Sequence, residues 1–237
     1  MMKAVWLSFR QMLACLRRDM MLFAACAAPF LAGFFFRFGI PFLEAVLTDW
    51  LCMPEILSPY YRLFDVVFAM LSPVMFCFVA AMVSLEEADE KTAAYLFITP
   101  LGKTGYLVSR LGVPGAVAFL LTLVLFPVFQ LTAFSPAAVF LFAAGGTLQG
   151  MIVALLVLTI SSNKLEGMAV TKLATLIVIG AVVPFFVKGD LQYAASVLPS
   201  FWMGRAACGH GLLSMFPAFA LSGVWIWLLL KRYQRKM

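Results

Sequence analysis

The sharpest local signal in the sequence is a cluster of four acidic residues within five positions. The cluster consists of Glu86, Glu87, Asp89 and Glu90. An apolar run over 93–98 follows at once, and Thr99 and Pro100 end it. This pattern predicts a short helix with its acids in the first turn, where the helix dipole favours negative charge, and its apolar residues in the last. A helix this short is marginal alone and becomes stable when a partner packs on it. The other interpretation is a solvated charge run that caps a membrane helix.

Residue types that support intramembrane catalysis are scarce. The chain has one histidine, His210, and no H-E-x-x-H, G-x-S-x-G or phosphate-binding loop. The sequence therefore indicates neither an enzyme nor a chain that hydrolyses ATP by itself. The long apolar stretches are also nearly free of titratable groups, which argues against an ion-coupled pump. Transport would need energy from a partner.

The elements that position these residues belong to a lipid bilayer. Of 237 residues, 64% are apolar and only 12% are charged, whereas soluble domains are about 45–50% apolar and about 25% charged. This composition excludes a soluble globular domain, a disordered chain and a secreted disulfide scaffold. We expect residues 1–237 to form one integral membrane domain with an all-α fold. The net charge of +6 does not indicate nucleic acid, because the positions of the basic residues matter more than their sum.

Six stretches are long and apolar enough to cross the membrane. They lie at about 20–40, 63–85, 111–134, 137–160, 169–187 and 211–230. Ser135 and Pro136 divide the 53-residue uncharged run over 111–163, because proline removes a donor and disfavours helix in the residue before it. Thirteen of the 17 Lys and Arg residues fall on the side that holds both termini. The positive-inside rule therefore predicts a multi-pass protein of the cell membrane with both termini in the cytoplasm.

Residues 1–19 precede the first span and predict an amphipathic helix in the interface plane. Apolar residues recur on one face and cations occupy most of the other. The residues that define this interfacial helix are Trp6, Phe9, Arg10, Arg17 and Arg18. On the outer side, Arg37 and Asp65 form a candidate ion pair, since an isolated charge in lipid is costly. A disulfide between Cys52 and Cys208, both in predicted outer loops, is left open.

Three motifs in this order resemble the membrane subunit of ABC-2 type transporters, the class V exporter permeases. The first motif is similar to the family's E-x-E-x-G-T…L…T-P pattern, with Lys91 in place of the glycine. The matching residues are Glu87, Asp89, Thr92, Leu96, Thr99 and Pro100. The second motif is Lys164-Leu165-Glu166-Gly167 followed by Lys172, and the third is Leu198-Pro199-Ser200-Phe201-Trp202 followed by Arg205-Ala206. The likeness covers most of the chain and is greatest to drug or bacteriocin exporters.

The resemblance implies a coupling helix between spans two and three that docks on a separate ATPase. The implied coupling residues are Glu86, Glu87, Asp89, Glu90, Lys91, Tyr95, Leu96, Thr99 and Pro100. A second cytoplasmic connection comprises Lys164, Glu166, Gly167 and Lys172. The resemblance further implies short re-entrant outer helices before span six, two ATPase copies that bind ATP and Mg, and a second permease that is either identical or a diverged sister. No cofactor or metal is expected in this chain.

The function implied is export of a hydrophobic or amphipathic compound, such as a drug, an antimicrobial peptide or a lipid-like molecule. The uncharged spans suit such a cargo better than an ion. The alternative from another class is a six-span substrate-capture subunit of a vitamin-type importer, which binds cargo within one monomer.

Overall fold

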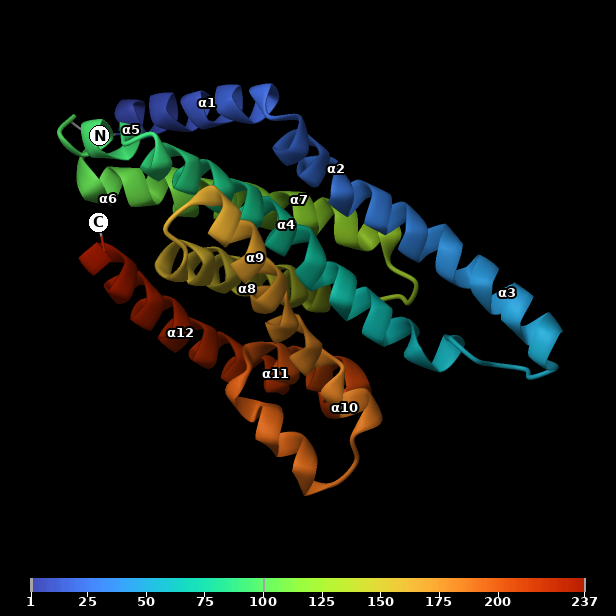
Figure 1. Ribbon diagram of the computed structural model, residues 1–237. Helices are drawn as coiled ribbons and strands as arrows, with labels where there is room; N and C mark the ends of the chain where they lie inside the picture. Colours follow the sequence, from blue (N-terminus) through green and yellow to red (C-terminus); the bar gives the residue numbers. More distant parts are fainter. Residues whose placement is uncertain (1, 100, 237) are drawn as a thin grey trace.

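The computed structural model describes residues 2–99 and 101–236, and this part of the chain is all-helical, without strands. The predicted fold class, an all-α membrane protein, is therefore confirmed. Within these described residues, five helical stretches are long and apolar enough to cross a membrane. They are Met20–Leu51, Ser58–Asp89, Gly102–Phe129, Pro136–Ile160 and Leu212–Lys236. Both termini lie at the same end of the bundle, which we call the termini-bearing end (Figure 1).

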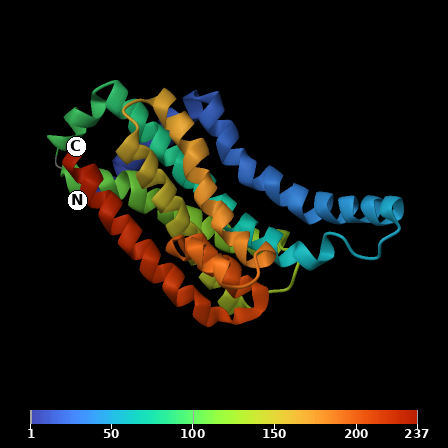
Figure 2. The same cartoon turned by 60° about the horizontal axis from the view of Figure 1, so that its bottom comes forward.

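Several spans combine α-helix with a short π-helical or 3-10 segment. The first joins α2 (Met20–Phe34) to α3 (Ile40–Leu51) through a π-helical turn, Phe35–Gly39, and extends away from the bundle (Figures 1 and 2). The second is α4 (Tyr61–Asp89), and the third joins α6 (Gly102–Leu107) to α7 (Val113–Phe129) through π-helical Val108–Gly112. The remaining two are formed mainly by α8 (Pro136–Ile160) and α12 (Met215–Lys236).

Several span boundaries differ from the prediction: the first span continues from 40 to Leu51, the second begins at Ser58, and the last ends at Lys236. The second span continues past residue 85 to Asp89, and the third begins at Gly102 instead of 111. Charged residues were expected to end both helices, but Glu87 and Arg110 pair with each other inside them. The third span stops at Phe129, before the predicted 134, because residues 130–135 form a linker that leads into α8.

The fifth predicted span, 169–187, is not one long α-helix. It consists of α9 (Lys164–Ala174), a 3-10 segment Thr175–Ala181 and α10 (Val183–Phe186). The Ser200 hydroxyl donates a 2.5 Å hydrogen bond to the carbonyl of Ile177 within the 3-10 segment. A Cβ at Gly204 would lie 2.2 Å from the carbonyl oxygen of Ala181, so the backbones touch here. The count of six spans stays a prediction.

Short helices precede α12, as the sequence predicts. A 3-10 segment, Asp190–Val197, is followed by α11 (Pro199–Arg205), and Pro199 begins the second piece. Phe201 and Met203 of α11 are buried against the bundle, while the 3-10 segment projects from it (Figure 1). The π-helical Ala206–His210 and 3-10 Leu212–Ser214 lead into α12. Cys52 and Cys208 are free thiols.

The centre of the bundle is the contact between α4 and α8. Pro73 lacks the N–H that would bond the carbonyl of Ala69 one turn earlier. Gly146 of α8 packs directly on that carbonyl, and a Cβ there would lie 2.1 Å from the Ala69 oxygen. Gly150, one turn on, meets the carbonyl of Pro73 in the same way, at 2.8 Å. The GxxxG motif therefore allows two backbones to touch where a proline has broken the hydrogen-bond ladder.

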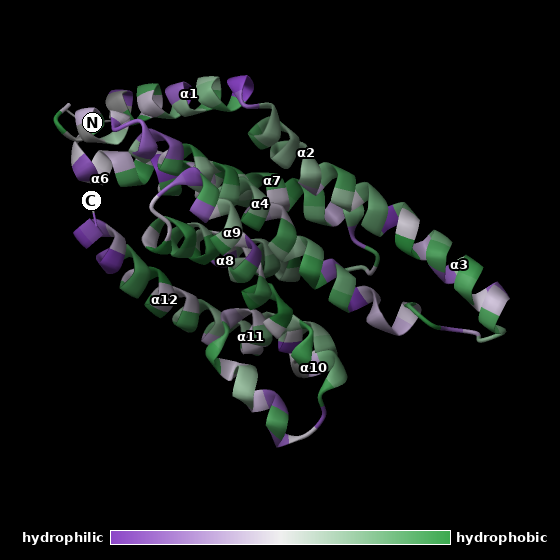
Figure 3. Cartoon of the chain, in the orientation of Figure 1, coloured by the Kyte–Doolittle hydropathy of each residue, from purple (hydrophilic) through white to green (hydrophobic). Residues whose placement is uncertain are grey.

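Peripheral spans contrast with this core. In the spans formed by α4 and α8, 72% of the most apolar stretch is buried inside the protein. The corresponding share is 17% in α2–α3 and 22% in α12. Polar residues gather at the ends of the helices and apolar residues along them (Figure 3). The exposed flanks suit contact with lipid or with a second membrane chain.

Replacement of Gly146 by alanine should destabilise the bundle, by about 1–3 kcal/mol, because the new methyl group must displace the α4 backbone. Gly223→Ala in α12 is the matched control, since a Cβ at Gly223 meets nothing within 4 Å. Thermal unfolding of the detergent-solubilised protein measures both. Equal melting temperatures for the two variants would contradict the close α4–α8 contact.

Candidate functional site

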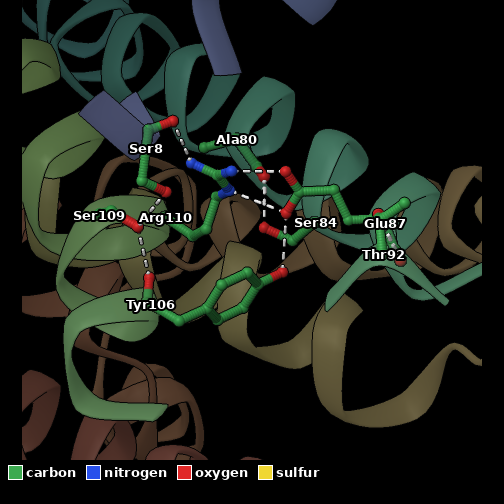
Figure 4. A network of polar contacts seen from close by, with 8 residues as sticks. All are labelled: Ser8, Ala80, Ser84, Glu87, Thr92, Tyr106, Ser109 and Arg110. Carbon is green, nitrogen blue, oxygen red and sulfur yellow. Dashed lines mark hydrogen bonds and ion pairs between the residues drawn. The ribbon is translucent and has the colours of Figure 1, made fainter. Parts of the chain in front are cut away.

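The termini-bearing end contains a buried polar network centred on Glu87 of α4 and Arg110 of the π-helical segment Val108–Gly112 (Figure 4). Arg110 Nη2 donates to Glu87 Oε1 at 2.5 Å, and Arg110 Nε donates to Glu87 Oε2 at 2.9 Å. The pair is bidentate, and its side chains are only 1% and 8% exposed. Such fork-to-fork pairing adds geometric specificity to the charge interaction.

Three further residues complete this network, which we call the Glu87–Arg110 network. Tyr106 donates its hydroxyl to Glu87 Oε2 at 3.0 Å. Arg110 Nη1 donates to the backbone carbonyl of Ser8 at 2.9 Å, and the hydroxyls of Ser8 and Ser109 lie 3.3 Å apart. The network therefore joins α1 (Met2–Arg18), α4 and the start of the third span at one point.

Helical spacing explains how the sequence builds this network. Tyr106 and Arg110 are four residues apart, so they share one helix face. Glu87 follows the long buried face of α4 and points inward from the last turn. Breaking a buried charge pair leaves one uncompensated charge, and this costs about 3–5 kcal/mol. The network thus fixes the positions of α1, α4 and the start of the third span relative to one another. This holds whether or not the ion pair raises the net free energy of unfolding.

A second cluster at the same end surrounds Lys164. Its ammonium contacts Asp19 Oδ2 at 2.5 Å and Glu86 Oε2 at 2.8 Å, and its backbone N–H donates to Asp89 Oδ2 at 2.9 Å. The hydrogen bond from Lys164 holds the pKa of Asp19 below its usual value, and Asp19 also caps α2 by accepting from two backbone N–H groups. The predicted second connection therefore meets the predicted coupling acids directly.

The predicted coupling segment differs in detail from the structure. Its acids lie in the last turn of α4 and the turn after it, not in the first turn of a separate helix, and the short helix is α5 (Thr92–Phe97). Lys91 adopts the left-handed conformation with φ of 58° at the family's glycine position, which is unusual for a residue with a Cβ. Glu87 is buried, so it cannot contact a partner. Pro100 lies outside the described residues.

Five exposed residues of this segment define what we call the α4–α5 surface. It consists of Asp89, Glu90, Lys91, Tyr95 and Ile98. Tyr95 is 69% exposed and Ile98 84% exposed. Leu96, also predicted here, instead packs on the buried cluster of Ala93, Leu101 and Tyr106. Thr99 closes the turn by donating to the Leu96 carbonyl at 2.7 Å.

Of the remaining predicted residues at this end, some pack against the protein and others are exposed. Phe9 is buried against the bundle, so α1 packs partly on protein, whereas Trp6 is 60% exposed. The three arginines of the interfacial helix are exposed: Arg10, Arg17 and Arg18. Gly167 packs on Leu85, and Lys172 is exposed. Glu166 accepts from the backbone N–H of Ser162 at 2.7 Å and so secures the start of α9.

Arg37 and Asp65 do not form the predicted ion pair. Arg37 donates to the carbonyl of Gln130 at 2.9 Å, and Asp65 accepts from the backbone N–H groups of Leu131 and Thr132 at 2.6 and 2.9 Å. Each charged side chain therefore forms hydrogen bonds with backbone groups of the linker after α7 and holds this linker in place. This role is structural and lies at the opposite end from the Glu87–Arg110 network.

Arg110, Tyr106 and Ser8 were missed as site residues. From the sequence, Arg110 is only one of the 13 basic residues that predict the orientation. A usable signal was present, because Tyr106 and Arg110 lie at i and i+4 directly before a long uncharged run. An arginine at such a position needs a buried partner, either an acid or a backbone carbonyl.

Comparisons with known proteins identify a matching family and two relatives. The family model described as "Fluoroquinolones export permease protein Rv2686c-like" matches residues 12–231. Two similar relatives come from Mycobacterium tuberculosis: Fluoroquinolones export permease protein MT2760 of strain CDC 1551 / Oshkosh and Fluoroquinolones export permease protein Rv2686c of strain ATCC 25618 / H37Rv. Each is 24% identical over 212 residues, which cover 84% of this chain and 82% of the relative.

Separate replacement of Glu87 by glutamine and Arg110 by methionine should each lower the free energy of unfolding by about 3–5 kcal/mol, because each leaves a buried charge unpaired. The double variant should lose clearly less than the sum of the two. Chemical or thermal unfolding in detergent measures this cycle. Glu90→Gln, at an exposed neighbour, should change stability by less than about 0.5 kcal/mol. Strictly additive losses would contradict the pairing.

Proposed function

The chain belongs to the Fluoroquinolones export permease protein Rv2686c-like family, and we propose from this membership that it is the membrane subunit of an ATP-driven drug exporter powered by a separate ATPase. As a member of that family with an all-helical apolar fold, it is an ABC-type export permease of the membrane. The observation that carries the proposal further is the α4–α5 surface, an exposed charged and apolar patch mounted on a buried ion pair.

The α4–α5 surface has the composition expected of a docking site. Tyr95 and Ile98 supply an aromatic and an aliphatic anchor, each more than two-thirds exposed. Asp89, Glu90 and Lys91 flank them with charges that steer a partner and fix its register. Such a surface suits a groove in a soluble partner better than it suits lipid. We assign that partner as the ATPase, which would hold ATP and Mg.

Support for a mechanical role comes from the mounting of this surface. The Glu87–Arg110 network ties the α4–α5 region to α1 and to the third span. Lys164 ties the same region to α9 and to the start of α2. A force applied at Tyr95 or Ile98 would therefore move several spans together. ATP-driven closure of two ATPases would tilt two such bundles and open a path between them, as a rigid-body change.

The transported compound is proposed to be a hydrophobic or amphipathic drug. Both relatives carry the name of fluoroquinolone export permeases, so a fluoroquinolone is the first cargo to test. The peripheral spans α2–α3 and α12 leave large apolar residues exposed, including Phe34, Phe38 and Trp227. These flanks would face lipid and a second permease, either a copy of this chain or a sister. The importer alternative is not favoured, since the relatives are named for export.

Replacement of Ile98 by aspartate should remove most of the binding to the ATPase, because it places a charge at the apolar centre of the docking surface. We expect about a tenfold or greater loss of the P-loop ATPase that co-purifies with the tagged wild-type chain from its native membrane. Quantitative mass spectrometry of the purified complex measures this loss.

Trp50→Asp is the matched control, since Trp50 is 81% exposed and lies in α3 at the far end of the molecule (Figure 1). This variant should retain the ATPase. Equal retention by both variants, or a wild-type chain that carries no ATPase, would overturn the proposed docking.

A further inference from the structure

A cavity of about 310 Å³ lies at the termini-bearing end, separate from the α4–α5 surface except for Lys91. Its walls come from the last turns of α4, α8 and α12 and from α5 and α6. The volume is at the lower limit of typical ligand pockets. It is large enough for a headgroup or a small amphipathic molecule, and too small for a folded partner.

One polar group in this cavity has no partner within the protein. Ser161 follows α8 directly and is 1% exposed. Ser161 is one of the residues that line the cavity. Its hydroxyl makes no hydrogen bond among the described residues. A buried hydroxyl without a partner costs free energy. A ligand in the cavity that reaches this hydroxyl would supply the hydrogen-bond partner that it lacks.

The charged side chains that line the cavity are both lysines, Lys91 and Lys236. Carboxylates are absent from its described lining. Glu87 is nearby, but Arg110 pairs with it and Tyr106 covers it (Figure 4). The charged lining of the cavity is therefore positive, and the partnerless hydroxyl of Ser161 belongs to a residue of its wall.

Lys236 offsets the negative potential at the C-terminal end of α8. Its ammonium donates to the carbonyls of Leu158 at 3.1 Å and Thr159 at 3.4 Å, and to that of Ser161. These are unpaired carbonyls at the C-terminus of α8, where the helix dipole repels anions. With this end capped by a cation, an anion can approach Ser161.

We propose that this cavity binds the acidic headgroup of an anionic amphiphile, with a phosphate as the preferred group. Ser161 donates a hydrogen bond to the phosphate, and Lys91 and Lys236 balance its charge. Leu85 and Leu158 on the cavity wall contact the adjoining apolar part of the ligand.

The position of the cavity favours a membrane lipid as the source of this headgroup. The cavity lies where the long apolar helices α4, α8 and α12 end, which is the depth of the headgroups in a bilayer. Lysines at this depth attract anionic lipids. A soluble phosphate would satisfy the polar groups equally well but would leave the apolar wall uncovered.

Thermal unfolding of the purified chain in neutral detergent, without an ATPase, tests the site. The probes are short-chain phosphatidylglycerol, phosphatidylcholine with the same chains, and inorganic phosphate. We expect phosphatidylglycerol to raise the melting temperature in a saturable way and phosphatidylcholine to have no effect. A comparable rise with inorganic phosphate would support the anion site and assign it to a soluble ligand.

Two variants and one control decide whether the effect comes from this cavity. Ser161→Ala should bind the effective probe about tenfold more weakly, equivalent to about 1.4 kcal/mol, while the unliganded protein melts no lower than wild type, because the hydroxyl has no partner to lose. Lys91→Gln should show a similar loss of affinity. Lys3→Gln removes an exposed charge from α1, at the same end of the molecule, and should bind normally.

The proposal is overturned if neither anionic probe shifts the melting temperature, or if Ser161→Ala and Lys91→Gln respond like wild type. A lower melting temperature of unliganded Ser161→Ala would also overturn it, because it would assign the hydroxyl a structural partner. Since the ATPase is not used, these outcomes are independent of the proposed docking at the α4–α5 surface.

Discussion

The bidentate pair of Glu87 and Arg110 is the interaction on which the termini-bearing end depends. Two charges are removed from water, and among the described residues they bond each other, with Tyr106 donating to Glu87 and the Ser8 carbonyl accepting from Arg110. The geometry leaves little freedom, because displacement of any one element exposes an unpaired charge to an apolar interior. For this reason α1, the end of α4 and the start of the third span hold fixed positions, and the exposed α4–α5 surface has a rigid base.

A different constraint holds the middle of the bundle. There, Pro73 frees the carbonyl of Ala69, and Gly146 and Gly150 allow α8 to pack against the exposed backbone of α4. The core is thus joined by backbone contact at its centre and by a buried ion pair at one end. The outer spans α2–α3 and α12 take part in neither of these two interactions and remain largely exposed. This division suits a transporter, since a rigid pair of helices can transmit a motion while the peripheral helices slide against lipid or a second subunit.

The fold was largely readable from the sequence, because apolar run length and the Ser135–Pro136 break are local signals. The short helices before α12 were also readable, as was the helix Met2–Arg18 that precedes the first span. The misassigned features depend on contacts between distant residues. The sequence around Glu87 is typical of a solvated acid. In the structure Glu87 is buried and pairs with Arg110, which lies 23 residues later in the chain. Arg37 and Asp65 resembled an ion pair, but the backbone of residues 130–132 satisfies each of them separately. The presence of a charged residue in the sequence does not identify the group that it pairs with. A backbone partner is especially hard to predict, because every residue has a backbone and the side-chain types do not mark it.

Transport and ATP hydrolysis, measured together in proteoliposomes that contain this chain and the proposed ATPase, test the central claim most directly. The informative variant carries Glu87→Leu and Arg110→Leu, which remove the ion pair without leaving a charge and keep the α4–α5 surface. If the Glu87–Arg110 network transmits the motion, this variant retains ATP hydrolysis and loses ATP-dependent fluoroquinolone transport. Wild-type transport per ATP hydrolysed would contradict the claim and reduce the network to a local structural feature.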